Sequence, residues 1–184
     1  MPTIDLECDG IVSENFAVSI NRAYNDDTHL AEALNSQLAV STLVDLPADA
    51  DAVTSATIFY RGGVNGSKRT ASVDAKLLTS GGTMLVEEAN DLSQNQTIAV
   101  ALFNTSTFTS TSAGVFTPAM VNDMRLQMKH AGNVVGTPTL MLEYIFVRVV
   151  YTLVTGGPET YDSSANNIHC TLGNIHVKSG NILL

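Results

Sequence analysis

Hydrophobic residues recur at every second position through much of the chain, which is the spacing of a β-strand that buries one face. The segments with this spacing are residues 16–20, 38–44, 54–63, 70–78, 97–103, 124–130 and 139–154. Turn residues separate them roughly every 8 to 15 positions, as is typical of all-β sandwiches and barrels. The pattern therefore predicts an all-β domain with an antiparallel sheet.

The most apolar segment, "TLMLEYIFVRVVYTLV" at 139–154, is predicted to be a long central strand. A membrane-spanning helix needs roughly 20 apolar residues, and this run is shorter and contains Glu143 and Arg148. Its β-branched and aromatic residues also favour a strand. Alternation assigns one face to the core, formed by Ile145, Val147, Val149, Tyr151 and Leu153. The opposite face is mixed, with Tyr144, Phe146, Arg148, Val150 and Thr152, and it is either half covered or in contact with a partner.

Turn and capping residues define the local connections. Asn65-Gly66 is a tight-turn signal, so the strands at 54–63 and 70–78 are expected to form a β-hairpin. Thr117 as cap and Pro118 as first helical residue predict a short helix. A further helical turn is expected within residues 26–34.

The chain shows one candidate boundary, the polar loop at residues 155–167. We predict a β-sandwich domain over 1–155, in which the segment 1–25 is weakly patterned. Residues 156–184 are then a C-terminal loop with an extra strand or an extended arm. This last part contains two short strand-like pieces.

Composition narrows the class of protein further. The chain has 184 residues, of which 45% are hydrophobic and 15% charged, which suits one compact domain without a secretory or targeting segment. The net charge is −9, and it resides entirely in residues 1–51, which contain ten acids and a single base, Arg22. This distribution argues against binding to nucleic acid or to an anionic membrane. The acidic first third either contacts a basic protein surface or serves solubility.

No catalytic or metal-binding set can be assembled from the sequence. Cys8 and Cys170 are far apart and are expected to be reduced, partly buried thiols. His169, Cys170 and His176 come nearest to a metal cluster, but zinc sites need four ligands and adjacent strand residues point to opposite faces. Asp49 and Asp51 lack the remaining ligands of a calcium loop. We predict no catalytic residue, no metal site and no cofactor, and hence no enzyme.

A series of short motifs resembles a family of tailed-bacteriophage virion proteins. In chain order these motifs are Asp26-Asp27-Thr28, Leu46-Pro47, Ser80-Gly81-Gly82-Thr83, Thr117 to Asn122, and Glu143 to Tyr151. The resemblance covers about residues 24–152, and the family often has Trp before the helix where this chain has Phe116. It implies a jelly-roll-like β-sandwich with one or two short helices and no catalytic residues.

The resemblance implies a structural role in the virion. The first expectation is a capsid decoration (cement) protein that clamps neighbouring subunits of the major capsid protein on the outer capsid surface. It would be a homotrimer, made in the host cytoplasm, with no nucleic-acid or membrane partner. The alternative is a tail, neck or fibre module that binds a host-surface glycan. The absence of Trp and the presence of only five Tyr weigh against stacking of sugar rings.

Overall fold

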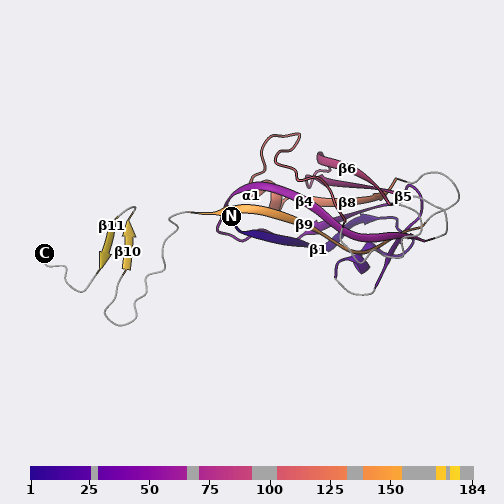
Figure 1. The fold of residues 1–184 in the computed structure, drawn as a ribbon, viewed down its shortest axis with the longest axis horizontal. Helices are drawn as coiled ribbons and strands as arrows, with labels where there is room; N and C mark the ends of the chain where they lie inside the picture. The colour runs from indigo at the N-terminus through magenta and orange to yellow at the C-terminus, as the bar shows by residue number, and fades with distance from the viewer. Residues whose placement is uncertain are drawn as a thin grey trace. The chain divides into compact units, whose positions relative to one another are not determined.

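The computed structural model describes residues 1–25, 29–65, 71–92, 103–131, 139–154, 169–172 and 175–178 (Figure 1). The chain divides into two compact units, Met1–Thr152 and Leu153–Leu184. In the second unit, β10 (His169–Leu172) and β11 (Ile175–Lys178) pair antiparallel.

The first unit is an antiparallel, jelly-roll-like β-sandwich, as predicted. Its elements are β1 (Thr3–Glu14), the 3-10 helix η1 (Ile20–Ala23), β2 (Ala31–Ala33), β3 (Leu38–Leu43), β4 (Ala50–Asn65), β5 (Ala71–Leu78), β6 (Met84–Leu92), β7 (Phe103–Asn104), α1 (Pro118–Asn122), β8 (Arg125–His130) and β9 (Thr139–Leu153). Sheet A has the order β1-β9-β4-β7, with β2 also beside β9, and sheet B has the order β6-β5-β8-β3-β1.

Strand β1 belongs to both sheets. Residues Thr3–Glu7 pair with β9 in sheet A, and residues Cys8–Glu14 pair with β3 in sheet B. The register shifts between Cys8 and Gly10 and again between Ile11 and Ser13, which bends the strand from one sheet to the other. These irregularities interrupt the two-residue period. For this reason the sequence shows only weak patterning where the structure has a 12-residue strand.

The core lies between the two sheets, and the predicted strands at its centre are confirmed. On β9, Ile145, Val147 and Val149 are fully buried, and on β8 the predicted inward residues Leu126 and Met128 are buried as well. The predicted inward position of Leu153 is wrong. It is 42% exposed, because it lies beyond Val150, where the pairing with β1 ends.

The alternation along β9 changes phase near its middle. Leu140 and Leu142 are buried, then Glu143 and Tyr144 are both partly exposed, and burial resumes at Ile145. Two successive residues therefore face away from the core, which is the signature of a strand irregularity. The faces predicted from the sequence hold from Tyr144 to Thr152.

Both predicted strands around Asn65 exist, but the predicted hairpin is wrong. β4 pairs with β9 and β7 in sheet A, whereas β5 pairs with β6 and β8 in sheet B. Alternation of apolar residues identifies the buried face of a strand and does not identify its hydrogen-bonded neighbour. The connection at 66–70, which includes Gly66, lies outside the described residues.

The predicted helix is confirmed as α1, and its neighbours hold it in place. The Thr117 Oγ1 accepts a hydrogen bond from the Met120 backbone N–H at 3.1 Å, as an N-cap does. At its other end, the Asn122 Oδ1 accepts from the Leu46 N–H at 2.9 Å. The side chain of Asp123 accepts from the Ser80 hydroxyl at 2.6 Å. Among the described residues, no helix is long and apolar enough to cross a bilayer.

Two further local predictions are wrong. Within the expected helical turn at 26–34, Ala31–Ala33 forms strand β2, because its small buried side chains pair with Leu140 and Leu142 of β9. Within the expected strand at 16–20, Val18 makes one isolated bridge and the chain then enters η1. Most of the expected strand at 97–103 lies outside the described residues.

Candidate functional site

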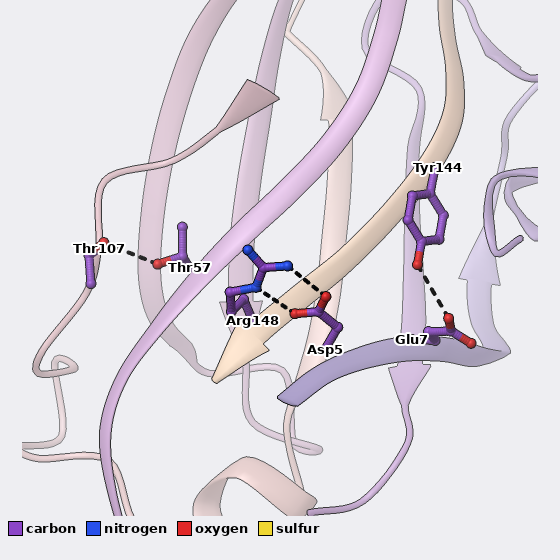
Figure 2. A network of polar contacts seen from close by, with 6 residues as sticks. All are labelled: Asp5, Glu7, Thr57, Thr107, Tyr144 and Arg148. Atoms are coloured by element: carbon purple, nitrogen blue, oxygen red, sulfur yellow. Dashed lines mark hydrogen bonds and ion pairs between the residues drawn. The ribbon is translucent and has the colours of Figure 1, made fainter. Parts of the chain in front are cut away.

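The outward face of sheet A gathers charged and aromatic side chains from three adjacent strands. Successive strand residues point to opposite faces, so burial of Leu6, Ile58 and Val147 turns their neighbours outward. We call the resulting group the outer patch. Its members are Asp5 and Glu7 on β1, Thr57, Phe59 and Arg61 on β4, and Glu143, Tyr144, Phe146 and Arg148 on β9. Figure 2 shows five of these residues together with Thr107.

A paired guanidinium and carboxylate form the centre of the outer patch. Asp5 and Arg148 are cross-strand partners in register. The Arg148 Nε donates to the Asp5 Oδ1 at 2.6 Å, and the Nη2 donates to the Oδ2 at 2.7 Å (Figure 2). This two-point geometry fixes the plane of the guanidinium. The hydrogen bonds to Asp5 are the main cause that raises the pKa of Arg148.

A layer of aromatic rings lies directly beneath the guanidinium. The rings of Phe59 and Phe146 are stacked, with centroids 5.0 Å apart and an angle of 3° between their planes. The Arg148 Cζ lies 4.8 Å from the centroid of Phe59 and 5.5 Å from that of Phe146, within the range of cation–π contacts. Phe146 is therefore only 2% exposed although it points away from the core. The mixed face of β9 is half covered, and its own arginine provides part of the cover.

Further polar contacts border this centre. The Tyr144 hydroxyl donates to the Glu7 Oε1 at 3.3 Å (Figure 2). The Tyr144 ring packs at a tilt of 38° against Phe146. Arg61 and Glu143 form an ion pair at 3.6 Å, which is possible because the phase change in β9 turns Glu143 outward.

The outer patch carries groups that are suited to recognition. It presents three acids and two arginines over aromatic rings, and its central arginine is held in a single orientation. Arginine and aromatic residues are the side chains that dominate binding energy at protein interfaces. The sequence placed Arg148 on this face. The sequence did not predict that Asp5 and Phe59 lie beside Arg148. The bulges in β1 interrupt its two-residue pattern, and the strand partner of β4 was misassigned.

The buried Cys8 thiol belongs to a hydrogen-bonded group with Ser41 and Tyr24. Burial raises the pKa of the Cys8 thiol to about 12, so the thiol stays protonated and is a poor nucleophile. Its hydrogen-bond partner Ser41 lies 2.7 Å from the hydroxyl of Tyr24, which is also 3.0 Å from the Gly10 carbonyl oxygen. Cys8 is free and buried, as expected. The side chain of Cys170 lies outside the described part of the chain.

The side chains considered as metal ligands are those in the described part of the chain. Within that part of the chain, no group of three His, Cys, Asp or Glu residues could hold a metal ion. The backbone places Cys170 opposite Val177, and Thr171 opposite His176, in the β10–β11 pair. The side chains of this pair lie outside the described residues.

Comparison with known proteins gives a structural likeness alone. Neither a protein-family model nor a curated protein sequence matches the chain. Seven chains of solved structures match it. One of them, described as "CBM4 structure and function", aligns with 82% of this chain and 94% of that chain, with 12% sequence identity and a TM-score of 0.42. The strand pairing described above defines the fold class without reference to this likeness.

Proposed function

We propose that this chain is a non-enzymatic structural protein of a phage particle. We place it on the outer capsid surface as a decoration protein that clamps neighbouring subunits of the major capsid protein. The observation that carries the proposal is the preordered centre of the outer patch, in which Asp5 and the stacked Phe59–Phe146 pair hold Arg148. The motif order described above supplies the phage context.

A preordered arginine favours tight attachment. Ordering a long flexible side chain on binding costs free energy, and here Asp5 and Phe59 have already ordered Arg148 in the free protein. The patch also joins β1 and β9, whose paired residues Asp5 and Arg148 lie 143 positions apart in the chain. Force applied at this patch is therefore shared by strands from both ends of the domain, which suits a clamp. Assembly as a homotrimer is part of the same proposal.

The composition of the patch also favours a second candidate, a tail, neck or fibre module that binds a host-surface glycan. Carboxylates, guanidinium groups and a tyrosine hydroxyl are groups that hydrogen-bond to sugar hydroxyls. The ring of Tyr144 forms one border of the patch, whereas Phe146 is covered. Under this candidate, Tyr144 would carry the ring stacking, and Tyr144→Ala would abolish binding to host polysaccharide.

A reconstitution experiment tests the leading proposal. Particles of the phage that encodes this chain, assembled without it, are incubated with the purified protein, and bound copies are counted by quantitative electrophoresis and located by image reconstruction. The expected result is hundreds of copies on the capsid shell, strongly reduced for Arg148→Ala. Lys76→Ala is the matched control, because Lys76 forms a 2.6 Å ion pair with Glu87 on sheet B, away from the patch. Six to a few dozen copies at the tail, or full attachment of Arg148→Ala, would contradict the proposal.

A further inference from the structure

The second half of β1 is an exposed edge strand. After Glu7, β1 leaves β9, and β2 takes over the position beside β9 at Leu140–Leu142. From Cys8 to Glu14 the strand pairs with β3 on one side, and no strand among the described residues pairs with its other side. Such an edge presents backbone N–H and C=O groups to any extended segment that approaches.

Side chains on this edge are unusually apolar for an exposed strand. The last four residues of β1 are all exposed, and two of them, Ile11 and Val12, are β-branched and 41% exposed. Val12 lies within the second register shift, between Ile11 and Ser13, which lifts it out of the regular pairing with β3. β-Branched side chains on an open edge are the contacts that strand addition uses for specificity.

Charge selects the kind of partner that this edge accepts. β1 carries four acids, Asp5, Glu7, Asp9 and Glu14, and no basic residue. Asp5 and Glu7 lie in the half that pairs with β9, where they bind Arg148 and Tyr144. Asp9 and Glu14 lie in the edge half, where Asp9 accepts from Thr42 at 2.5 Å and Glu14 accepts from the Ser19 hydroxyl and the Ile20 N–H. A second copy of the same strand would bring like charges together, which disfavours self-pairing. A basic strand would be attracted.

We infer that the Cys8–Glu14 half of β1 is a docking edge for an extended, lysine- or arginine-bearing segment of another protein. The segment adds to sheet B as a sixth strand, beside β1. Its backbone bonds to the free side of β1, its apolar residues cover Ile11 and Val12, and its basic residues meet Asp9 and Glu14. This site uses the opposite half of the strand from the outer patch and does not depend on the function proposed for that patch.

A synthetic peptide of alternating valine and lysine serves as the probe, and a peptide of alternating valine and glutamate serves as its charge control. Binding to the full chain is measured by fluorescence anisotropy at low and high salt, and the bound site is mapped by amide hydrogen exchange. The expected result is salt-sensitive binding of the lysine peptide, with new protection of amides between Ile11 and Ser13. Equal binding of the glutamate peptide, or protection elsewhere, would overturn the inference.

Matched variants locate the effect. Val12→Lys is expected to weaken binding of the lysine peptide by about tenfold or more, because it removes an apolar contact and adds a repulsive charge. Val115→Lys makes the same change at a 70% exposed valine in the loop beside β6, at the opposite edge of sheet B, and should bind as the unaltered chain does. Thermal melting checks that both variants fold. Equal losses of peptide binding in the two variants would overturn the inference. A dimer of the protein alone that Val12→Lys abolishes would overturn it as well, because the edge would then accept a second copy.

Discussion

At the scale of single residues, neighbours on β9 have opposite roles. Val147 is fully buried opposite Leu6, whereas Arg148 lies on the outer patch opposite Asp5. Alternation alone predicted this difference, because a strand places successive side chains on opposite faces. What Arg148 contacts could not be predicted, because its partners come from strands about 140 and 90 positions away in the chain.

Replacement of these two neighbours should therefore give opposite results. Val147→Asp is expected to prevent folding, because a buried, unpaired carboxylate costs several kcal/mol against a total stability of about 5–15 kcal/mol. Arg148→Ala should leave the domain folded, since its ion pair is partly exposed. Circular dichroism and thermal melting measure both. A folded Val147→Asp together with an unfolded Arg148→Ala would mean that the register of β9 is shifted by one residue.

A buried histidine should make stability depend on pH. His130 is fully buried at the end of β8, with its Nδ1 3.1 Å from the Ala33 carbonyl oxygen, and burial is the main cause that lowers its pKa. The unfolded chain takes up a proton near the ordinary pKa of about 6.5, whereas the folded protein does so only at lower pH. The free energy of unfolding should therefore be constant above about pH 7 and fall as the pH drops below about 6.5.

Denaturant titrations between about pH 5 and pH 8 measure this dependence. His130→Phe should remove most of the dependence of the free energy of unfolding on pH in this range, whatever the effect of the substitution on stability at neutral pH. His29→Gln, at an exposed histidine, is the control and should keep the slope. An unchanged slope in His130→Phe would assign the pH dependence to other groups.

At the scale of elements, a glycine of β4 leaves no room for a side chain against β9. A Cβ atom added at Gly62 would lie 2.7 Å from the Met141 carbonyl oxygen and 3.0 Å from the Leu142 Cδ2. The first of these atoms is backbone and can move only if the strand moves. The contact lies next to the phase change at Glu143, so the fit of these two strands sets which residues β9 turns toward the outer patch.

We expect Gly62→Ala to destabilise the domain by about 1–3 kcal/mol, as overpacking does in a well-packed core. Chemical denaturation measures the loss. Gly81→Ala is the matched control, because a Cβ there would meet only the Thr79 Oγ1, at 3.8 Å. Equal stabilities of the two variants would show that β4 and β9 can separate at this point without cost.

The sequence predicted elements whose signals are local and missed those that depend on distant partners. The α1 helix was predicted correctly because Thr117 and Pro118 act within one turn, and β8 was predicted because Met124 to Met128 alternate without interruption. Strand β2 resembled a helical turn because its three residues carry little pattern, and its pairing with β9 decides its form. The hairpin error has the same origin, since the partners of β4 and β5 lie elsewhere in the chain.

At the scale of the whole molecule, the sandwich is expected to be stable without the C-terminal unit. Every described strand of both sheets ends by Leu153, and the last pair between β1 and β9 is Thr3 with Val150. A chain truncated after Val154 should therefore melt within a few degrees of the full-length protein. Differential scanning calorimetry measures this comparison. A large drop in melting temperature would show that residues 155–184 stabilise the sandwich.

The place of β9, the last strand of the sandwich along the chain, also dictates an order of assembly during synthesis. All strands of sheet B have been made once His130 has left the ribosome, whereas sheet A lacks its central strand until β9 has followed. Until then, the nascent chain exposes the apolar face of sheet B, including Leu77, Leu126 and Met128. Because pairings between distant segments form slowly, closure of the sandwich is expected after synthesis of β9 and to limit the folding rate. A growing chain of this protein therefore has most need of a chaperone between residues 130 and 153, when one half of its core is complete and the other is absent.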